Sequence, residues 1–124
     1  MATATQDKIE KLKKELARNE EIELAVIGRK TGRKSSRPVW FVVEGDRLYL
    51  LPVTGSDSEW FKNILNNPRI TISAGGQNGE FTAEPVQDPN IVASVVDKFR
   101  KKYGASEVKK YYSKFDVAVI VYLK

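Results

Sequence analysis

The chain has 124 residues, 41% of them apolar, and it carries 21 Lys and Arg against 16 Asp and Glu, a net charge of +5. This length and composition predict one globular domain over residues 1–124, with a modest core. The sequence contains no Cys and no His, which excludes disulfides, thiolate chemistry, zinc sites built on those residues and catalysis by a histidine base. No run resembles a membrane helix or a signal core, so we expect a cytoplasmic protein.

The first predicted element is a helix from about residue 6 to residue 19, with Thr5 as its N-cap. Ile9, Leu12 and Leu16 recur at spacings of three and four residues and form one narrow apolar stripe. The stripe favours a helix that covers one end of the core. A basic helix on a membrane surface is the alternative.

Three strands are predicted next, over residues 22–27 (IELAVI), 37–43 (RPVWFVV) and 47–53 (RLYLLPV). The last two are separated by Glu-Gly-Asp at residues 44–46, which is typical of a hairpin turn. The three strands should therefore form an antiparallel meander.

After the third strand, the spacing of the apolar residues changes to that of a helix. Ser56 and Glu59 have the spacing of a capping box, and the apolar residues that follow recur four apart. Pro68 restricts the backbone of Asn67, so the helix should end there.

Two strands, at residues 69–74 (RITISA) and 80–86 (EFTAEPV), are predicted around a glycine-rich turn at residues 75–79. Pro85 suggests that the second of them lies at a sheet edge.

The C-terminal third is predicted to hold two helices and a strand. Asp88 and Pro89 form an N-cap and first-turn pair, and Gly104 should end that helix. A short helix over 106–112 follows. Residues 116–123 (DVAVIVYL) are apolar on both faces, which indicates a central strand.

The predicted fold class is α+β, mainly β. Six strands, three or four helices and hairpins with inserted helices favour a six-stranded antiparallel split β-barrel with an N-terminal helix and helices inserted between strands. An open antiparallel sheet with helices on one face is the competing architecture.

The positive charge is concentrated in one turn. Residues 26–42 contain five basic residues and no acid, and the rest of the chain has 16 basic and 16 acidic residues. Two glycines and three hydroxyl side chains share the turn with Arg29, Lys30, Arg33, Lys34 and Arg37. This composition suggests a phosphate or carboxylate site. A solvated loop and a nucleic-acid contact remain alternatives.

A second candidate anion site follows the third strand. Thr54, Gly55 and Ser56 lie between a strand and a helix, where unpaired backbone N–H groups and hydroxyls can hold an oxyanion. Asp57 and Glu59 argue against an anion site here, because their own carboxylates could accept hydrogen bonds from the free N–H groups at the start of the helix. The nearby Trp60 could be a core residue or a surface for ligand stacking.

Taken together, these segments resemble the deazaflavin-dependent nitroreductase family of the split-barrel, FMN-binding and pyridoxamine phosphate oxidase-like group. The matching pieces are GRKTGR (28–33), Pro38, GDRLYLL (45–51), TGS (54–56), Trp60, Asn63 and NNPRITI (66–72). The resemblance extends from about residue 22 to residue 86. The pieces are specific for the family only in combination, and no single piece is.

The resemblance implies a flavoprotein-like oxidoreductase that transfers a hydride from reduced 8-hydroxy-5-deazaflavin (coenzyme F420) to a small electron-poor acceptor. It also implies a homodimer. The basic turn would hold the anionic tail of the cofactor, and the second segment would lie near the ring system. The cofactor-binding residues that it implies are Arg29, Lys30, Thr31, Arg33, Arg37, Pro38, Thr54, Gly55, Ser56, Trp60 and Asn63.

Several points remain open at this stage. The family has a longer loop before the tryptophan, with a Lys and a Pro, so FMN is an alternative cofactor. Tyr111 and Tyr112 are candidate proton donors or simple packing residues. No metal site is expected. A non-catalytic cofactor-binding or sequestering protein and a small basic nucleic-acid-binding protein are the other functional hypotheses.

Overall fold

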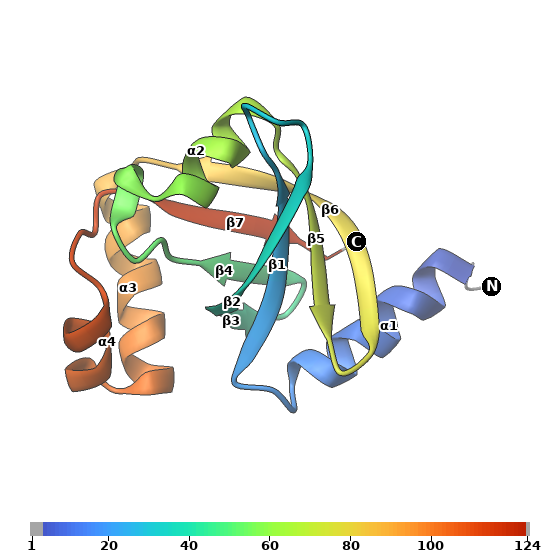
Figure 1. Cartoon of the computed structure of the whole chain (residues 1–124). Helices are drawn as coiled ribbons and strands as arrows, with labels where there is room; N and C mark the ends of the chain where they lie inside the picture. Colours follow the sequence, from blue (N-terminus) through green and yellow to red (C-terminus); the bar gives the residue numbers. More distant parts are fainter. Residues whose placement is uncertain (1–3, 124) are drawn as a thin grey trace.

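The computed structural model describes residues 4–123 and contains a seven-stranded sheet, four α-helices and one short 3-10 helix (Figure 1). The helices are α1 (Ala4–Leu16), η1 (Gly55–Asp57), α2 (Glu59–Asn66), α3 (Pro89–Tyr103) and α4 (Ala105–Tyr111). The strands are β1 (Glu21–Ile27), β2 (Lys34–Trp40), β3 (Val42–Glu44), β4 (Arg47–Leu50), β5 (Arg69–Ala74), β6 (Gln77–Val86) and β7 (Ala118–Tyr122).

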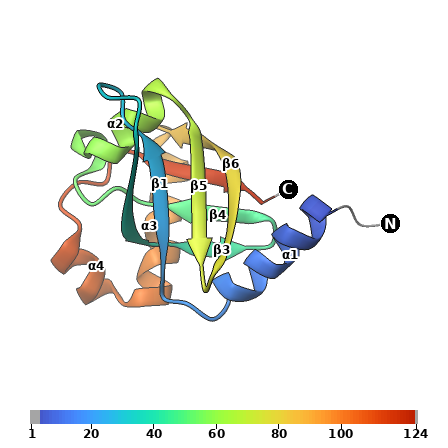
Figure 2. The same cartoon turned by 45° about the vertical axis from the view of Figure 1, so that its right-hand side comes forward.

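The sheet has seven strands and not the predicted six, because the strand expected over residues 37–43 is divided at Phe41. Its first part, β2, pairs with β1, and its second part, β3, pairs with β4. The strand order is β2-β1-β5-β6-β7-β4-β3, with every pair antiparallel. The two edge strands are thus separated along the chain by one residue, so the sheet must curl into a half-barrel (Figures 1 and 2).

The core lies on both faces of this curled sheet. Inside the curl, α1 and α2 contribute Leu12 and Phe61, which pack with β-strand residues such as Ile72. On the other face, α3 and α4 pack through Phe99 and Val108 with residues of β3, β4 and β7. In Figure 1, α3 and α4 lie at one end of the molecule and α1 at the other. The helices therefore cover two faces, and the competing arrangement of an open sheet with helices on one face does not apply.

The apolar stripe of α1 is buried as expected, with Leu12 fully inaccessible to solvent. The predicted ends of this helix are wrong. It includes Thr5, which therefore does not cap it, and it ends at Leu16. The side chain of Asn19 donates to the carbonyl of Glu15 (2.7 Å), so a side chain satisfies part of the exposed helix end.

The predicted capping box of α2 is also wrong. The N-cap is Ser58, and Ser56 lies in the preceding 3-10 turn, where its hydroxyl donates to Asp116. The spacing of Ser56 and Glu59 is that of a capping box, but a carboxylate distant in sequence competes for the same donors.

The C-terminal elements agree with those predicted from the sequence. The Asp88 side chain accepts hydrogen bonds from the backbone N–H groups of Asn90 and Ile91 at the start of α3, and Gly104 ends the helix. The strand β7 lies between β6 and β4, as its continuous apolar sequence predicted.

Pro85 occupies a position with only one neighbouring strand. It pairs with Val119 of β7, whereas the pairing of β6 with β5 ends at Thr82. The N–H of Ala83 points toward the β5 side, to the carbonyl of Pro68 (2.8 Å), and Pro85 faces the same side two residues later. A proline is tolerated there because it needs no ladder partner. The strand as a whole is not an edge strand.

The break between β2 and β3 is held by the end of α3. The hydroxyl of Tyr103 accepts from the N–H of Phe41 (3.1 Å) and lies within donating distance of the carbonyls of Glu20 (2.6 Å) and Phe41 (2.9 Å). Lys102 donates to the carbonyl of Phe41 (2.7 Å) and lies over the Phe41 ring. Burial raises the pKa of Tyr103 to about 12, so the phenol remains protonated. These contacts satisfy backbone groups that the sheet leaves unpaired.

No helix within residues 4–123 is long and apolar enough to cross a membrane.

Candidate functional site

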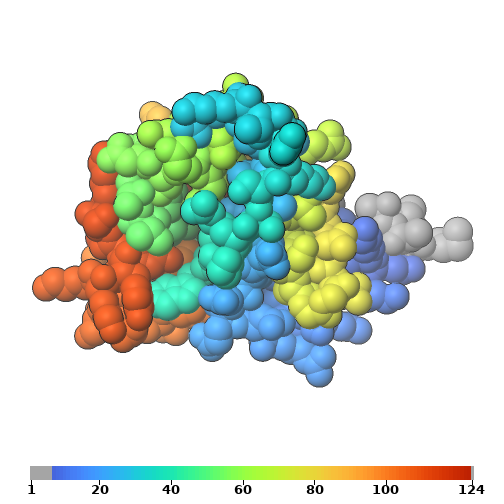
Figure 3. All heavy atoms as spheres, in the orientation of Figure 1, coloured from blue at the N-terminus to red at the C-terminus, as the bar shows by residue number. Residues whose placement is uncertain are grey.

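A cleft of about 740 Å³ lies where β2, the segment before α2 and α4 meet. These elements are blue-green, green and orange-red on the face shown in Figure 3. The cleft combines aromatic, aliphatic and charged side chains. Its lining residues are Glu21, Arg37, Pro38, Val39, Trp40, Leu51, Val53, Thr54, Asp57, Ser58, Glu59, Trp60, Glu107, Tyr111 and Tyr112.

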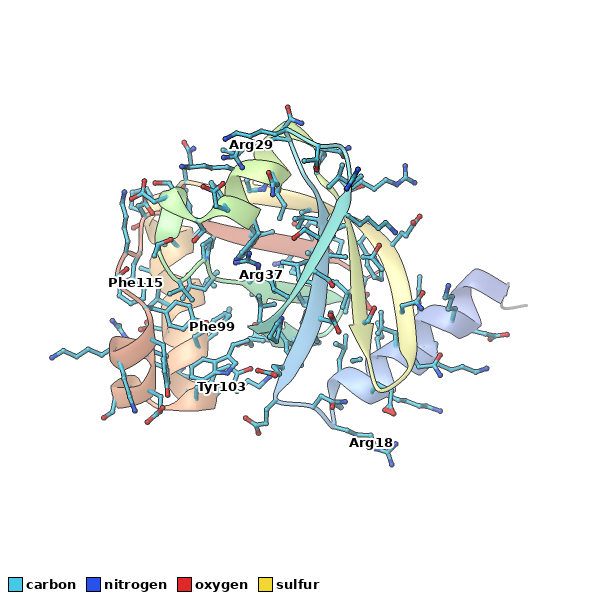
Figure 4. All side chains as sticks on the ribbon, in the orientation of Figure 1. Arg18, Arg29, Arg37, Phe99, Tyr103 and Phe115 are labelled. Carbon is cyan, nitrogen blue, oxygen red and sulfur yellow. The ribbon has the colours of Figure 1, made fainter. Side chains whose placement is uncertain are left out.

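The basic turn and α2 lie against each other beside this cleft. Asn63 accepts hydrogen bonds from the backbone N–H of Arg29 (3.1 Å) and from its guanidinium (2.8 Å). The same guanidinium pairs with the carboxylate of Glu59 at 2.6 Å. The hydrogen bond and charge of Arg29 lower the pKa of Glu59. Arg29 and Asn63 therefore fix the turn on the helix, and Figure 4 shows Arg29 next to α2.

The backbone of the basic turn offers few donors to a ligand. The N–H groups of Gly28 and Gly32 donate within the turn, to the carbonyls of Arg33 and Gly28. The N–H of Arg33 donates to the hydroxyl of Thr31 (3.2 Å), and that of Arg29 to Asn63. An anion at this turn would therefore be held mainly by side chains.

The second predicted cradle is also satisfied from within the chain. The N–H groups of Gly55, Asp57 and Ser58 donate to backbone carbonyls of the same turn, and that of Thr54 donates to the Ser58 hydroxyl. The remaining N–H, that of Ser56, donates to the Asp116 carboxylate (2.9 Å), as does the Ser56 hydroxyl. The oxyanion that this turn binds is therefore the Asp116 carboxylate of the protein itself.

Asp116 lies close against the turn. Lys114 pairs with Asp57 (3.2 Å) and Asp116 (3.6 Å), and it forms an isolated bridge with Thr54. Partial burial would by itself raise the pKa of Asp116, but the hydrogen bonds from Ser56 and the charge of Lys114 lower it overall. The segment after α4 is thereby attached to the cleft floor.

Among the residues that the structure describes, Arg37 is the one cation that lines the cleft. Its side chain projects from β2 toward the side that carries α2 and α4 (Figure 4). Within residues 4–123, no hydrogen bond or ion pair involves its guanidinium. An arginine without a carboxylate partner in an aromatic cleft can bind an anionic group of a ligand.

Aromatic rings form much of the cleft wall. Trp40 stacks on Tyr103, with centroids 4.2 Å apart, and meets Tyr111 edge-on at 5.5 Å and Tyr112 at 6.0 Å. Trp60 is almost fully buried and belongs to the core, although it also lines the cleft. Burial raises the pKa of Tyr112, so its phenol can donate a hydrogen bond but is a poor acid.

The residues predicted for the site divide into two groups. Those in the cleft wall are Arg37, Pro38, Thr54, Trp60, Tyr111 and Tyr112. Those outside it are Arg29, Lys30, Thr31, Arg33, Gly55, Ser56 and Asn63. In the second group, Arg29 and Asn63 join the basic turn to α2, and Ser56 joins its turn to Asp116. A cofactor contact for each residue of this group remains a prediction.

Sequence reasoning missed Trp40, which contributes a central wall. Its position three residues after Arg37, within the same predicted strand, was a usable signal. Glu21 and Glu107 were also missed, because nothing local in the sequence shows that β1 and α4 face one cleft. Within the part of the chain that the structure describes, no group of three or more acidic residues could hold a metal ion.

Comparison with known proteins gives a family and a fold. The family model described as "Uncharacterized protein conserved in bacteria (DUF2255)" matches residues 12–119. No curated protein matches the chain.

Solved structures with the same fold include an F420-H2 dependent reductase, FDR-A, at 18% identity and TM-score 0.65, covering 83% of this chain and 94% of the other. HutZ, the heme storage protein from Vibrio cholerae, is similar at 14% identity and TM-score 0.65, covering 97% and 89%. A conserved hypothetical protein from Mycobacterium tuberculosis has 19% identity and TM-score 0.66, covering 98% and 79%. At these identities the likeness shows the fold alone.

Proposed function

The chain belongs to the DUF2255 family, and we propose that it is an oxidoreductase that binds a deazaflavin or flavin cofactor in the aromatic cleft. The observation that carries this proposal is the Arg37 guanidinium, which has no partner among residues 4–123 and lies in a cleft walled by Trp40 and two tyrosines. The resemblance of the sequence to deazaflavin-dependent nitroreductases and the fold shared with an F420-H2 dependent reductase support it.

The chemistry of the cleft suits a flat, anionic cofactor. Aromatic walls favour stacking with a planar ring, and a guanidinium pairs with phosphate or carboxylate oxygens. The cleft volume of about 740 Å³ is within the range of small-molecule sites. The side chains of Lys30 and Arg33 on the neighbouring turn make no hydrogen bond or ion pair within residues 4–123, so they are available to an anionic tail that extends from the cleft.

In this proposal the cofactor supplies hydride transfer to a small electron-poor acceptor, and the chain supplies binding and orientation. Arg37 would fix the position of an anionic group, and Trp40 would hold one face of the bound molecules in place. Tyr112 would donate a hydrogen bond from a phenol that stays neutral. Tyr111, which is half exposed, would border the opening of the cleft.

The proposal is tested by titrating the protein with the oxidised deazaflavin cofactor and, separately, with FMN while following ligand fluorescence. We expect saturable binding of one of them, weakened about tenfold or more in Arg37→Gln, because a charge-assisted hydrogen bond contributes about 1.5–3 kcal/mol. Arg18→Gln is the matched control, since it removes the same charge from an exposed residue distant from the cleft (Figure 4). Equal affinities for the two variants would contradict the proposal.

Turnover separates an enzyme from a binding or sequestering protein. The reduced cofactor should be oxidised faster with protein and a nitroaromatic acceptor than with the acceptor alone. Binding without acceleration would support the non-catalytic alternative, and salt-dependent binding to DNA without cofactor binding would support the nucleic-acid alternative.

Haem is the second ligand class that the fold suggests, through its likeness to HutZ. The chain has no His or Cys and a single Met at position 1, so tyrosine is the main remaining axial ligand. We therefore favour the flavin class. The homodimer implied by the family resemblance remains a prediction, which light scattering on the eluted protein would test.

A further inference from the structure

The cleft contains two carboxylates that pair with no cation among residues 4–123. Five charged residues line it, and two of the acids are paired from outside, Asp57 with Lys114 and Glu59 with Arg29. Within residues 4–123, Glu21 and Glu107 have no ion-pair or hydrogen-bond partner for their side chains. A cleft expected to attract anions thus keeps two unpaired negative charges.

Both carboxylates border the same aromatic corner. Glu21 is the cross-strand partner of Trp40 in the β1–β2 ladder. Glu107 lies four residues before Tyr111 on α4, which places the two residues on one side of the helix. The Trp40 and Tyr111 rings meet at an interplanar angle of 83°. The corner therefore has two ring walls at nearly a right angle with a carboxylate beside each.

This corner is separate from the unpaired arginine. Arg37 lies three residues before Trp40 on β2, a distance of about 10 Å along an extended strand. The cleft consequently has a positive end near Arg37 and a negative, aromatic end near α4. One end suits the anionic group of a cofactor, and the other suits a ligand of opposite charge.

We infer that the α4 end of the cleft binds an organic cation, such as an alkylated or aromatic ammonium group, in the angle beside the touching rings of Trp40 and Tyr111. Aromatic faces attract weakly hydrated organic cations, and neighbouring carboxylates strengthen that attraction. The ammonium group of Lys110, the preceding residue, lies 5.2 Å from the centroid of Tyr111, so this ring is placed where a cation can lie near it. Identifying this cation with the electron acceptor rests on the proposed function. The binding of a cation at this corner is independent of that function.

The test compares choline with 3,3-dimethylbutan-1-ol, which has nearly the same shape and no charge. Proton NMR of each ligand is recorded with the protein in the absence of any flavin. We expect choline to bind saturably, with its methyl signal shifted upfield by the aromatic rings, and the neutral alcohol to bind at least about tenfold more weakly. Equal binding of the two, or none of choline, would overturn the inference.

Variants then test the assigned residues. Glu21→Gln and Glu107→Gln should each weaken choline binding about fivefold. Glu23→Gln is the control, because it removes the same charge from an exposed position two residues along β1 and outside the cleft. Tyr111→Phe should retain binding and Tyr111→Leu should lose it, since only the former keeps the ring. If Glu23→Gln weakens binding as much as Glu21→Gln, general surface charge explains the effect and the site is wrong.

Failure of this inference is distinguishable from failure of the proposed function. Choline binding that depends on Glu21 and Glu107, without deazaflavin or FMN binding, would leave the cation site standing and reject the oxidoreductase. Flavin binding that depends on Arg37, without choline binding, would do the reverse.

Discussion

Gly55 is constrained in two ways. Its φ of +57° lies in the left-handed region, where a side chain is unfavourable, and a Cβ there would lie 2.1 Å from Oδ1 of Asp116. Gly45 has nearly the same φ, +60°, but nothing lies within 4 Å of a Cβ built on it. A side chain at Gly45 would therefore meet only backbone strain, whereas a side chain at Gly55 would meet backbone strain and a steric clash.

We expect Gly45→Ala to lower the free energy of unfolding by about 1 kcal/mol, the cost of the backbone conformation. Gly55→Ala should cost about 3 kcal/mol, because it also displaces Asp116 from the donors of Ser56. Urea unfolding of the two variants measures both values. Equal losses would show that the contact between Gly55 and Asp116 contributes little to stability.

The roles of individual arginines could not be predicted from the sequence. Arg29 and Arg37 have the same charge in the same predicted site. Arg29 is paired with Glu59, thirty residues away, whereas the Arg37 side chain in the cleft has no partner among residues 4–123. The charge-rich turn was visible in the composition. Which of its cations remain available depends on long-range partners, which no local pattern contains.

At the scale of elements, the junction between β2 and β3 depends on the end of α3. The single residue between the strands, Phe41, has both backbone groups bonded by Tyr103 or Lys102. Tyr103 also stacks on Trp40, so one side chain closes the sheet and supports the cleft wall.

Tyr103→Phe keeps this ring stacking and removes the hydroxyl. We expect the free energy of unfolding to fall by about 1–3 kcal/mol, because the Phe41 N–H loses its partner in a partly buried site. Tyr122→Phe, at an exposed tyrosine whose hydroxyl makes no hydrogen bond within residues 4–123, should change it by less than about 0.5 kcal/mol. Chemical denaturation measures the free energy of unfolding of both variants. A Tyr103→Phe protein as stable as Tyr122→Phe would show that the hydrogen bonds of the Tyr103 hydroxyl are dispensable for stability.

Element types followed from local patterns more reliably than element ends. The Asp88-Pro89 start of α3 and the doubly apolar β7 were predicted correctly, because their signals are local or reflect burial on both faces. The division at Phe41 was not predicted, since RPVWFVV reads as one strand. The capping box at Ser56 failed for a related reason, because Asp116 is distant in sequence and occupies the donors.

For the whole molecule, the half-barrel brings distant segments to one cleft. β2 supplies an arginine and a tryptophan, the segment before α2 supplies the floor, and α4 supplies tyrosine and carboxylate side chains. A mainly antiparallel sheet with inserted helices was predictable from the hairpins and the helical segments between them. The charge-separated cleft was not, because it arises only where the curled sheet and α4 meet.

The chain contains two tryptophans, Trp40 and Trp60, and both line the cleft. The central claim is therefore tested most directly by the two indole N–H signals in a ¹H–¹⁵N spectrum during titration with the deazaflavin cofactor. We predict that both signals shift, saturably and with the same dissociation constant. Indole signals that stay fixed, while only backbone amides of residues 28–33 shift, would place the ligand on the surface of the basic turn and contradict a cofactor site in the cleft.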